Sequence, residues 1–338
     1  METHFEIGWG TLWRALLVVV IAAGFFYSLD IIVGVFLAII ISSAINPFVT
    51  WLEEKISLPR VIGAVLVFLV ITLFLASLIY TVTPLIIEET HRLLENYFPY
   101  IGKVLDVDIL KNSDIFTLSF EKILGYISSF TGGNIFEWSQ SLFGSLTLFI
   151  SVLAMAFYLT VDHRGIERFL RAVLPLRYEE SAVDIFLRAR SKMGYWLQAQ
   201  ILLSFCVSLL VFAGLYVLGV PHAFVLAILA GILEIIPFVG PVFTAAFAFG
   251  VSFAISSQLA IYVLIYFTLV QQIENNVLVP LFMKQAVGLH PVAILIALLV
   301  GANLFGFVGL ILAVPATVVI EEFLDDLERR KSRRQTLV

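Results

Sequence analysis

Charged residues are scarce in this chain. Asp, Glu, Lys and Arg make up 13% of its 338 residues, whereas apolar residues make up 61%. An average soluble domain has about 25% charged residues, and about half of its residues are apolar. So little polar surface does not cover a soluble particle of this size. The composition therefore excludes a soluble globular protein and predicts a membrane protein.

Cysteine and strong charge of one sign are also lacking. The single cysteine, Cys206, lies in an apolar run, which excludes an intrachain disulfide and a cysteine-based metal cluster. The net charge is only −5, and no basic arm interleaved with aromatic residues occurs. We therefore expect no nucleic-acid partner, no metal site and no cofactor.

Two motifs of energy-driven or catalytic membrane proteins are absent from the sequence. The phosphate-binding pattern G-x-x-x-x-G-K-[ST] does not occur, which disfavours an ATP-driven pump. The zinc pattern H-E-x-x-H does not occur, and the five histidines are scattered, which disfavours an intramembrane metalloprotease. We expect no enzyme and assign no catalytic residue.

Long apolar runs dominate what is present. A bilayer core about 30 Å thick is crossed by a helix of about 20 residues. The first run is followed at once by a second and lacks a small-residue cleavage site, so we interpret it as a retained span. We predict an all-α polytopic membrane protein with about six full spans and two re-entrant helical hairpins. The predicted spans are Leu12–Leu29, Ile31–Val49, Val61–Val82 (ending at Thr83-Pro84), Leu142–Val161, Trp196–Leu218 and Leu259–Leu281.

The distribution of charge divides the chain into five parts. Acids outnumber bases eight to four between residues 84 and 140, where apolar residues recur at helical spacing. The predicted parts are an N-terminal transmembrane scaffold of three spans (1–83), an acidic extracytoplasmic amphipathic helical region (84–140), the fourth span with a basic cytoplasmic linker (141–195), a transport region (196–320) and a basic cytoplasmic tail (321–338).

The positions of Lys and Arg predict the hairpins. Basic loops of membrane proteins lie in the cytoplasm, but a single span at 291–320 would place the basic tail outside. A hairpin at 291–320, with its tip at Gly301, Gly306 and Gly309, removes the conflict. The apolar stretch 222–256, broken at Pro237, Gly240 and Pro241, is a hairpin, two spans or one kinked span. Helix-then-hairpin, repeated with opposite orientation, is the inverted-repeat plan of many secondary transporters.

The segment LVQQIENNVLVP places a polar cluster inside the last predicted span. Facing lipid, its carboxylate alone would cost about 2.5–3.5 kcal/mol. Pro280 follows and removes a backbone donor, so the helix is expected to be kinked or unwound there. A ligand site and a structural hydrogen-bond network between helices are both open. The predicted binding residues of this segment are Gln271, Gln272, Glu274, Asn275 and Asn276.

Glu234 is the other acidic residue within an apolar stretch of the second half. It precedes the first hairpin tip, and Asn303 lies at the second tip, where free backbone groups near the midplane bind substrates or ions. Gln198 and Gln200 lie at the start of the fifth span. A solvated position for Glu234 at the membrane interface is the alternative. We predict a substrate or ion site that includes Glu234, Glu274 and Asn303.

The same residues carry a family resemblance. The run IIPFVGPVFTA and the segment from QQIENNVLVP to LAVPATVV resemble the autoinducer-2 exporter family, also called PerM-like. The resemblance covers essentially the whole chain. It implies export of a small solute, such as the quorum-sensing signal autoinducer-2, with sodium (lithium)/proton antiport as the alternative. It also implies a homo-oligomer, a pentamer in this family, in the bacterial cytoplasmic membrane with both termini in the cytoplasm.

A passive channel and an oligomeric scaffold stay open as functions of another class. A channel needs a polar pore, and the first four spans offer little beyond Ser42, Ser43 and Asn46. The hypothesis that the residue pattern favours is a secondary exporter that works by alternating access. Its expected partners are the lipid bilayer and a small-molecule or cation substrate.

Overall fold

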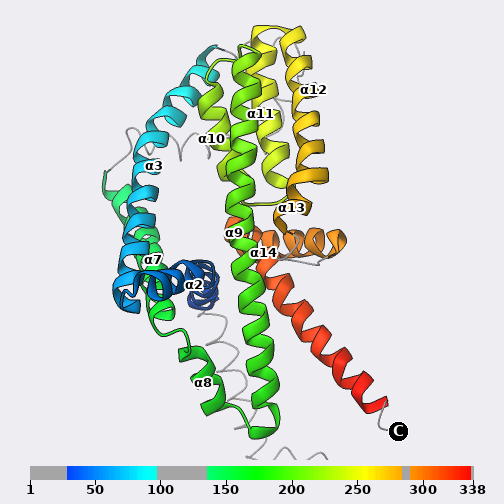
Figure 1. Cartoon of the computed structure of the whole chain (residues 1–338). Coiled ribbons are helices and arrows are strands. Elements are labelled where there is room, and N and C mark those ends of the chain that lie inside the picture. The colour runs from blue at the N-terminus through cyan, green and yellow to red at the C-terminus, as the bar shows by residue number, and fades with distance from the viewer. Residues whose placement is uncertain (1–28, 97–134, 284–289, 336–338) are drawn as a thin grey trace, which may run out of the picture.

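The chain is helical throughout the part that the computed structural model describes, residues 29–96, 135–283 and 290–335, and no strand occurs there (Figure 1). This confirms the all-α class. The helices are α2 (Leu29–Ile56), α3 (Arg60–Asn96), α7 (Ile135–Val161), α8 (Gly165–Val173), α9 (Leu176–Val217), α10 (Ala223–Leu233), α11 (Val239–Ile255), α12 (Ser257–Ile273), the π-helical turn η1 (Glu274–Leu278), α13 (Val279–Met283) and α14 (Pro291–Gln335).

Several of these helices can cross a membrane. Four pass by length and composition: Ile31–Ile56, Arg60–Leu78, Leu176–Val217 and Val292–Arg329, the last of which is interrupted at Gly306. A fifth results if α7 and α8, which are bent by 86° to each other, count as one span. The protein is therefore a polytopic membrane protein. The predicted span Leu12–Leu29 and most of the acidic region 84–140 lie outside the described residues, so the count of six spans stays a prediction.

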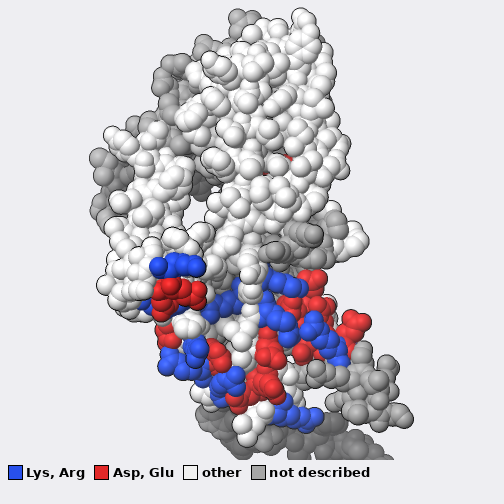
Figure 2. Space-filling model, viewed as in Figure 1, with Lys and Arg blue, Asp and Glu red and all other residues white. Residues whose placement is uncertain are grey.

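Helix α9 is the axis of the molecule. Its 42 residues extend about 63 Å at 1.5 Å per residue. The apolar C-terminal half packs against α10 and α12, and other parts of α9 contact α2, α8, α13 and α14. Figure 2 shows the charged side chains gathered at the lower end of the molecule, around the N-terminal half of α9. The predicted basic linker and the fifth span are thus one continuous helix, and the predicted boundary at residue 195 falls inside it.

Helix α3 differs from the prediction in its length. It continues through Thr83-Pro84 to Asn96, beyond the predicted span Val61–Val82, whereas the membrane span found within it is Arg60–Leu78. A proline removes one backbone hydrogen bond and bends a helix without necessarily ending it. Because the residues after Pro84 keep the helical spacing of apolar positions, the helix resumes beyond the missing bond.

The first predicted hairpin is present. In Figure 1, α10 descends from the upper end and α11 returns to it, and the two helices pack side by side. With 11 residues, α10 is about 17 Å long and too short to cross a bilayer. Gly240 makes the turn possible, since a Cβ there would lie 2.3 Å from the carbonyl oxygen of Leu233. Phe238 takes a positive φ of 64° in the same turn.

Helix α14 contains the second hairpin. Gly306 interrupts it with φ 57° and ψ −133°, a conformation that suits glycine. A Cβ on Gly309 would lie 1.9 Å from the carbonyl oxygen of Gly301, although residues eight apart in a straight helix are separated by about 12 Å. The chain therefore folds back at Gly306, and its two arms touch at Gly301 and Gly309. Figure 1 shows the arms meeting at a sharp angle.

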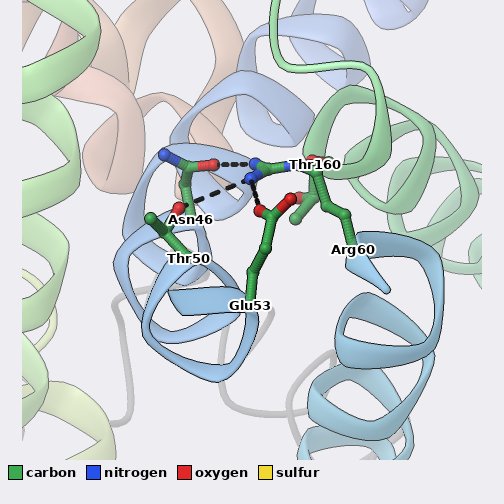
Figure 3. A network of polar contacts seen from close by, with 5 residues as sticks. All are labelled: Asn46, Thr50, Glu53, Arg60 and Thr160. Carbon is green, nitrogen blue, oxygen red and sulfur yellow. Dashed lines mark hydrogen bonds and ion pairs between the residues drawn. The ribbon is translucent and has the colours of Figure 1, made fainter. Parts of the chain in front are cut away.

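Arg60 joins the three helices of the N-terminal half (Figure 3). From the start of α3, its guanidinium donates to the Thr160 carbonyl of α7 at 3.0 Å and to Glu53 of α2 at 3.0 Å. It also donates to Asn46 and, at 3.4 Å, to Thr50, both on α2. The Arg60 side chain is only 14% exposed. This network fixes α2, α3 and α7 relative to one another.

We expect Gly309→Ala to destabilise the protein because the added methyl group forces the arms of α14 apart. The expected loss is about 1–3 kcal/mol in the free energy of unfolding, measured by thermal unfolding of the purified protein in detergent. Gly250→Ala is the matched control, because no atom lies within 4 Å of a Cβ at Gly250. Equal stability of the two variants would contradict the close contact between Gly301 and Gly309.

We expect Arg60→Gln to lower the free energy of unfolding by about 1.5–3 kcal/mol, because charge-assisted hydrogen bonds from α3 to α2 and α7 are lost. Arg168→Gln is the control, because it removes the same charge from an exposed ion pair with Asp162. The side chains of Arg168 and Asp162 are 69% and 53% exposed. That change should cost less than about 1 kcal/mol. Chemical denaturation in detergent compares the two variants, and a larger loss for Arg168→Gln would refute the network's role.

Candidate functional site

The predicted polar cluster divides between two faces of its helix. Glu274 is buried, with 6% of its surface exposed, and Gln271 is half-buried beside it. Gln272 and Asn276 are exposed and bond to each other, with Asn276 Nδ2 donating to Gln272 Oε1 at 2.8 Å. Only one face of the cluster therefore points into the protein.

The helix changes its hydrogen-bond pattern at Glu274. Residues Glu274–Leu278 form a π-helical turn, in which the Val279 N–H donates to the Glu274 carbonyl five residues earlier. Pro280 follows and has no N–H to continue the regular pattern. This confirms the predicted disturbance of the helix near Pro280. Single π-helical turns inside α-helices are frequent at functional sites.

Glu234 lies at the end of α10, inside the protein. Only 1% of its surface is exposed, so a solvated position at the interface is wrong. Gln200 of α9 donates from Nε2 to the Glu234 backbone carbonyl, which holds the hairpin tip against α9. Within the described residues, nothing hydrogen-bonds to Glu234 Oε2 or to Gln200 Oε1, although both atoms are buried.

The two buried carboxyl groups meet. Glu234 and Glu274 are 40 positions apart in the sequence, yet their side chains line one cavity and lie close enough to interact with each other. Gln271, three residues before Glu274, donates to Asn275 Oδ1 at 3.5 Å. The end of α10 and the end of α12 bring them together. The sequence predicted that both residues belong to one site, but it did not predict their direct contact.

A cavity with a volume of about 410 Å³ surrounds this pair. Besides Glu234 and Glu274, it is lined by Trp196, Gln200, Leu203, Pro237, Phe238, Gln271, Asn275, Val279, Met283, Ile294 and Val314. We call it the acidic cavity. Both hairpins and the α12–α13 segment contribute to its wall, and α9 closes one side.

The remaining predicted residues lie elsewhere. Asn303 is exposed and does not line the acidic cavity. Gly240 and Pro241 shape the first hairpin behind the lining residue Pro237. Gly301 and Gly309 line a separate apolar cavity of about 520 Å³ between α2 and α14. The second hairpin thus contributes Ile294 and Val314 to the acidic cavity rather than its polar tip residue.

Gln200 is the polar residue of the cavity that the sequence analysis did not assign to the site. Its presence in an apolar span was the available signal. Trp196 lies four residues earlier, on the same face of α9, and both are buried. Phe238 and Val314 gave no signal, since apolar lining residues look like any lipid-facing or core position.

Ion pairs at the lower end position the second arm of α14. Glu322 is 2% exposed and accepts from Lys192 Nζ at 2.6 Å and from Arg188 Nε at 2.7 Å, both on α9. Burial of one carboxylate between two cations keeps the arm in contact with α9. This contact sets the direction from which Val314, further up the same arm, reaches the acidic cavity.

Comparisons with known proteins agree over nearly the whole chain. A family model described as "AI-2E family transporter" matches residues 15–329. YueF of Bacillus subtilis, named as a transport protein, is 32% identical over 307 residues, covering 86% of this chain and 82% of YueF. YrrI of Bacillus subtilis is 27% identical, covering 92% and 94%. YhhT of Escherichia coli K12 is 25% identical, covering 91% and 88%. Both are also named as transport proteins, and these names point to transport rather than catalysis.

We expect cysteine substitutions to distinguish the two faces of the polar cluster. In a Cys206→Ser background, Asn275→Cys places a thiol in the acidic cavity, whereas Gln272→Cys places one on the outer face. A thiol facing lipid stays protonated and reacts slowly, so a hydrophilic thiol reagent should modify Asn275→Cys at least about tenfold faster. Mass spectrometry of the modified protein in liposomes measures both rates. Faster modification of Gln272→Cys would show that the cavity does not hold water.

Proposed function

Because the chain belongs to the AI-2E transporter family, we propose that it is a secondary transporter whose substrate site is the acidic cavity. The observation that carries the proposal is the contact between Glu234 and Glu274 in an otherwise uncharged part of the molecule. Membership of the family supports membrane transport. The acidic cavity, with its carboxyl pair, supports the location that we propose for the substrate site.

The carboxyl pair suits a coupling cation. Two negative charges at contact distance repel strongly in surroundings of low dielectric constant. A proton shared between them, or a small cation bound by both, removes that repulsion. Binding and release of the cation would then change the charge of the cavity, which gives transport a driving force without ATP.

The amide groups beside the pair suit a small polar solute. Gln271 and Asn275 line the cavity, and Gln200 Oε1 is buried there without a hydrogen-bond partner among the described residues. Amides donate to and accept from hydroxyl groups, and about 410 Å³ is within the usual range for small-molecule sites. A hydroxylated furanone such as autoinducer-2 has this chemistry, so its export is the substrate assignment that we favour.

The two hairpins suggest how access alternates. One hairpin, α10–α11, brings Glu234 and Pro237 to the cavity, and the other, α14, brings Ile294 and Val314. Both are breaks in helices that meet at one site, as in secondary transporters with inverted repeats. We propose that α9 to α14 move against a scaffold that the Arg60 network holds together.

The second candidate is sodium (lithium)/proton antiport. The same carboxyl pair favours antiport, because two carboxylates bind either a proton or an alkali cation, but not both at once. No organic solute is needed for this exchange. An uncoupled channel and an oligomeric scaffold are the further alternatives. Neither needs a buried carboxyl pair. A channel predicts conduction that Glu274→Gln does not change, and a scaffold predicts no flux phenotype from the loss of Glu274.

The placement in the membrane follows from charge. The lower end in Figure 2 carries the clustered Lys and Arg residues of α8, α9 and the second arm of α14, and such ends face the cytoplasm. We propose that this end is cytoplasmic, in the bacterial cytoplasmic membrane, with both termini on the same side. A homo-oligomer, a pentamer as the family resemblance implies, is the assembly to test.

The test measures flux in proteoliposomes that contain a trapped pH dye, under a clamped membrane potential. Sodium, lithium or autoinducer-2 is added to wild type, to Glu274→Gln and to Glu328→Gln. Glu328 is exposed and far along the second arm of α14, so Glu328→Gln makes the same chemical change outside the cavity. We expect a saturable proton response in wild type and Glu328→Gln, and a loss of at least about tenfold in Glu274→Gln.

The three solutes separate the hypotheses. A proton response to autoinducer-2 alone supports coupled export, and a response to sodium or lithium alone supports antiport. Autoinducer-2 flux without proton movement, unaffected by Glu274→Gln, would remove the coupling role of the carboxyl pair. Non-saturating current in both variants would indicate a channel.

A further inference from the structure

A second polar cavity lies at the boundary between the charged end and the apolar body. Its volume is about 430 Å³, and it is lined by Ser43, Asn46, Pro47, His163, Arg164, Glu167, Leu187, Arg190, Ser191, Gly194, Tyr195 and Gln198. We call it the basic cavity. These residues come from α2, from the turn between α7 and α8, from α8 and from α9. The acidic cavity shares none of them.

Polar contacts build the walls of the basic cavity. Arg190 is half-buried and donates to the His163 carbonyl at 2.6 Å, which joins α9 to the turn after α7. Gln198 donates to the Ala44 carbonyl of α2 at 2.6 Å. At Gly194, α9 approaches α2 so closely that a Cβ would lie 2.7 Å from the Ser43 carbonyl oxygen. The cavity is thus enclosed by three elements held in fixed positions.

The positive charge in the basic cavity is not balanced by the protein. Within the described residues, no carboxylate forms an ion pair with Arg164 or Arg190. The one acidic lining residue, Glu167, is bound to Arg171 at 3.2 Å, outside the cavity. Two guanidinium groups therefore face the space with no counter-charge of their own.

The pKa of His163 is affected by the same positive charges. Burial, and then the positive charges of Arg60, Arg164 and Arg190, lower its pKa, against a smaller opposite effect of Asp162. The imidazole therefore loses its proton at a lower pH than an unperturbed histidine, first because of burial and then because of these cations. A neutral ring can still hydrogen-bond to a ligand, while the net charge of the cavity comes from the arginines.

We propose that the basic cavity binds a phosphate-bearing anion through Arg164 and Arg190. Guanidinium groups present paired N–H donors that match the oxygens of phosphate. Ser191, directly after Arg190 on α9, and Tyr195, one turn beyond Ser191, add hydroxyl groups to the same wall. The cavity is lined by α8 and the N-terminal half of α9 on one side and by the apolar helix α2 on the other. Figure 2 shows the charged end of the molecule below an uncharged body, and such a boundary is the level of lipid headgroups in a membrane protein. Both a phospholipid headgroup and a soluble phosphate ester carry this chemistry.

The experiment measures binding to the purified full-length protein in detergent, by the shift in its melting temperature. The probes are phosphatidylglycerol, glycerol 3-phosphate and, as the ligand without phosphate, diacylglycerol. The proteins are wild type, Arg164→Gln, Arg190→Gln and Arg177→Gln. Arg177 is an exposed residue of α9 outside the cavity, so its variant makes the same charge change.

We expect saturable stabilisation of wild type and Arg177→Gln, with the apparent affinity weakened at least about tenfold in Arg164→Gln and in Arg190→Gln. The Arg164 side chain forms no hydrogen bond or ion pair with another described residue, and only its backbone carbonyl accepts one, from Arg168. The Arg164→Gln variant therefore tests binding even if Arg190→Gln unfolds. A response to phosphatidylglycerol alone identifies a lipid headgroup as the ligand, and a response to glycerol 3-phosphate identifies a soluble one.

Two results would overturn the proposal. One is the absence of stabilisation of wild type by either phosphate-bearing probe beyond that by diacylglycerol. The other is equal weakening in Arg177→Gln, which would show that binding depends on overall charge and not on this cavity. Neither result bears on the flux experiment, because the two cavities have no residue in common.

Discussion

The contact between Glu234 and Glu274 is the constraint around which the second half of the molecule is built. Two carboxyl groups away from water are unfavourable unless their polar atoms are satisfied. Gln200 donates to the backbone carbonyl of Glu234 and not to its carboxyl group, and Glu234 Oε2 has no hydrogen-bond partner among the described residues. Such an arrangement would be a poor way to gain stability, since apolar residues of similar volume would serve better. The carboxyl pair is therefore better explained by the proposed binding of a cation than by a contribution to stability.

The packing of the two hairpins also requires helix backbones to approach each other closely, and glycine residues permit this. Gly240, Gly301 and Gly309 each lie where a methyl group would meet a carbonyl oxygen. In a membrane, helices gain little from burying apolar surface against each other, so contact depends on small residues that let backbones come near. The hairpins are therefore packed by shape, while the charged lower end is held by the ion pairs of Glu322 and by the Arg60 network.

The sequence predicted the helical class and the breaks at Pro237–Pro241 and at Gly306, and it singled out Glu234 and Glu274, which the structure places at one cavity. These follow from local rules of hydropathy, glycine and proline, and of the cost of charge in lipid. It did not predict that α3 passes Pro84 or that Gln272 and Asn276 face outward, because helix length and rotation are set by tertiary neighbours. Gln200 and the basic cavity were missed for the same reason: their partners are far away in the sequence.

The continuity of α9 links the two cavities mechanically. Gln198 lines one and Gln200 lines the other, and two residues along a helix are separated by a rise of about 3 Å and a rotation of about 200°. The two side chains therefore project from nearly opposite sides of one rigid rod. A rotation of α9 about its long axis would therefore displace both side chains at once, in opposite directions. A ligand that fixed the rotation of α9 from one cavity would therefore also fix the position of a lining side chain in the other.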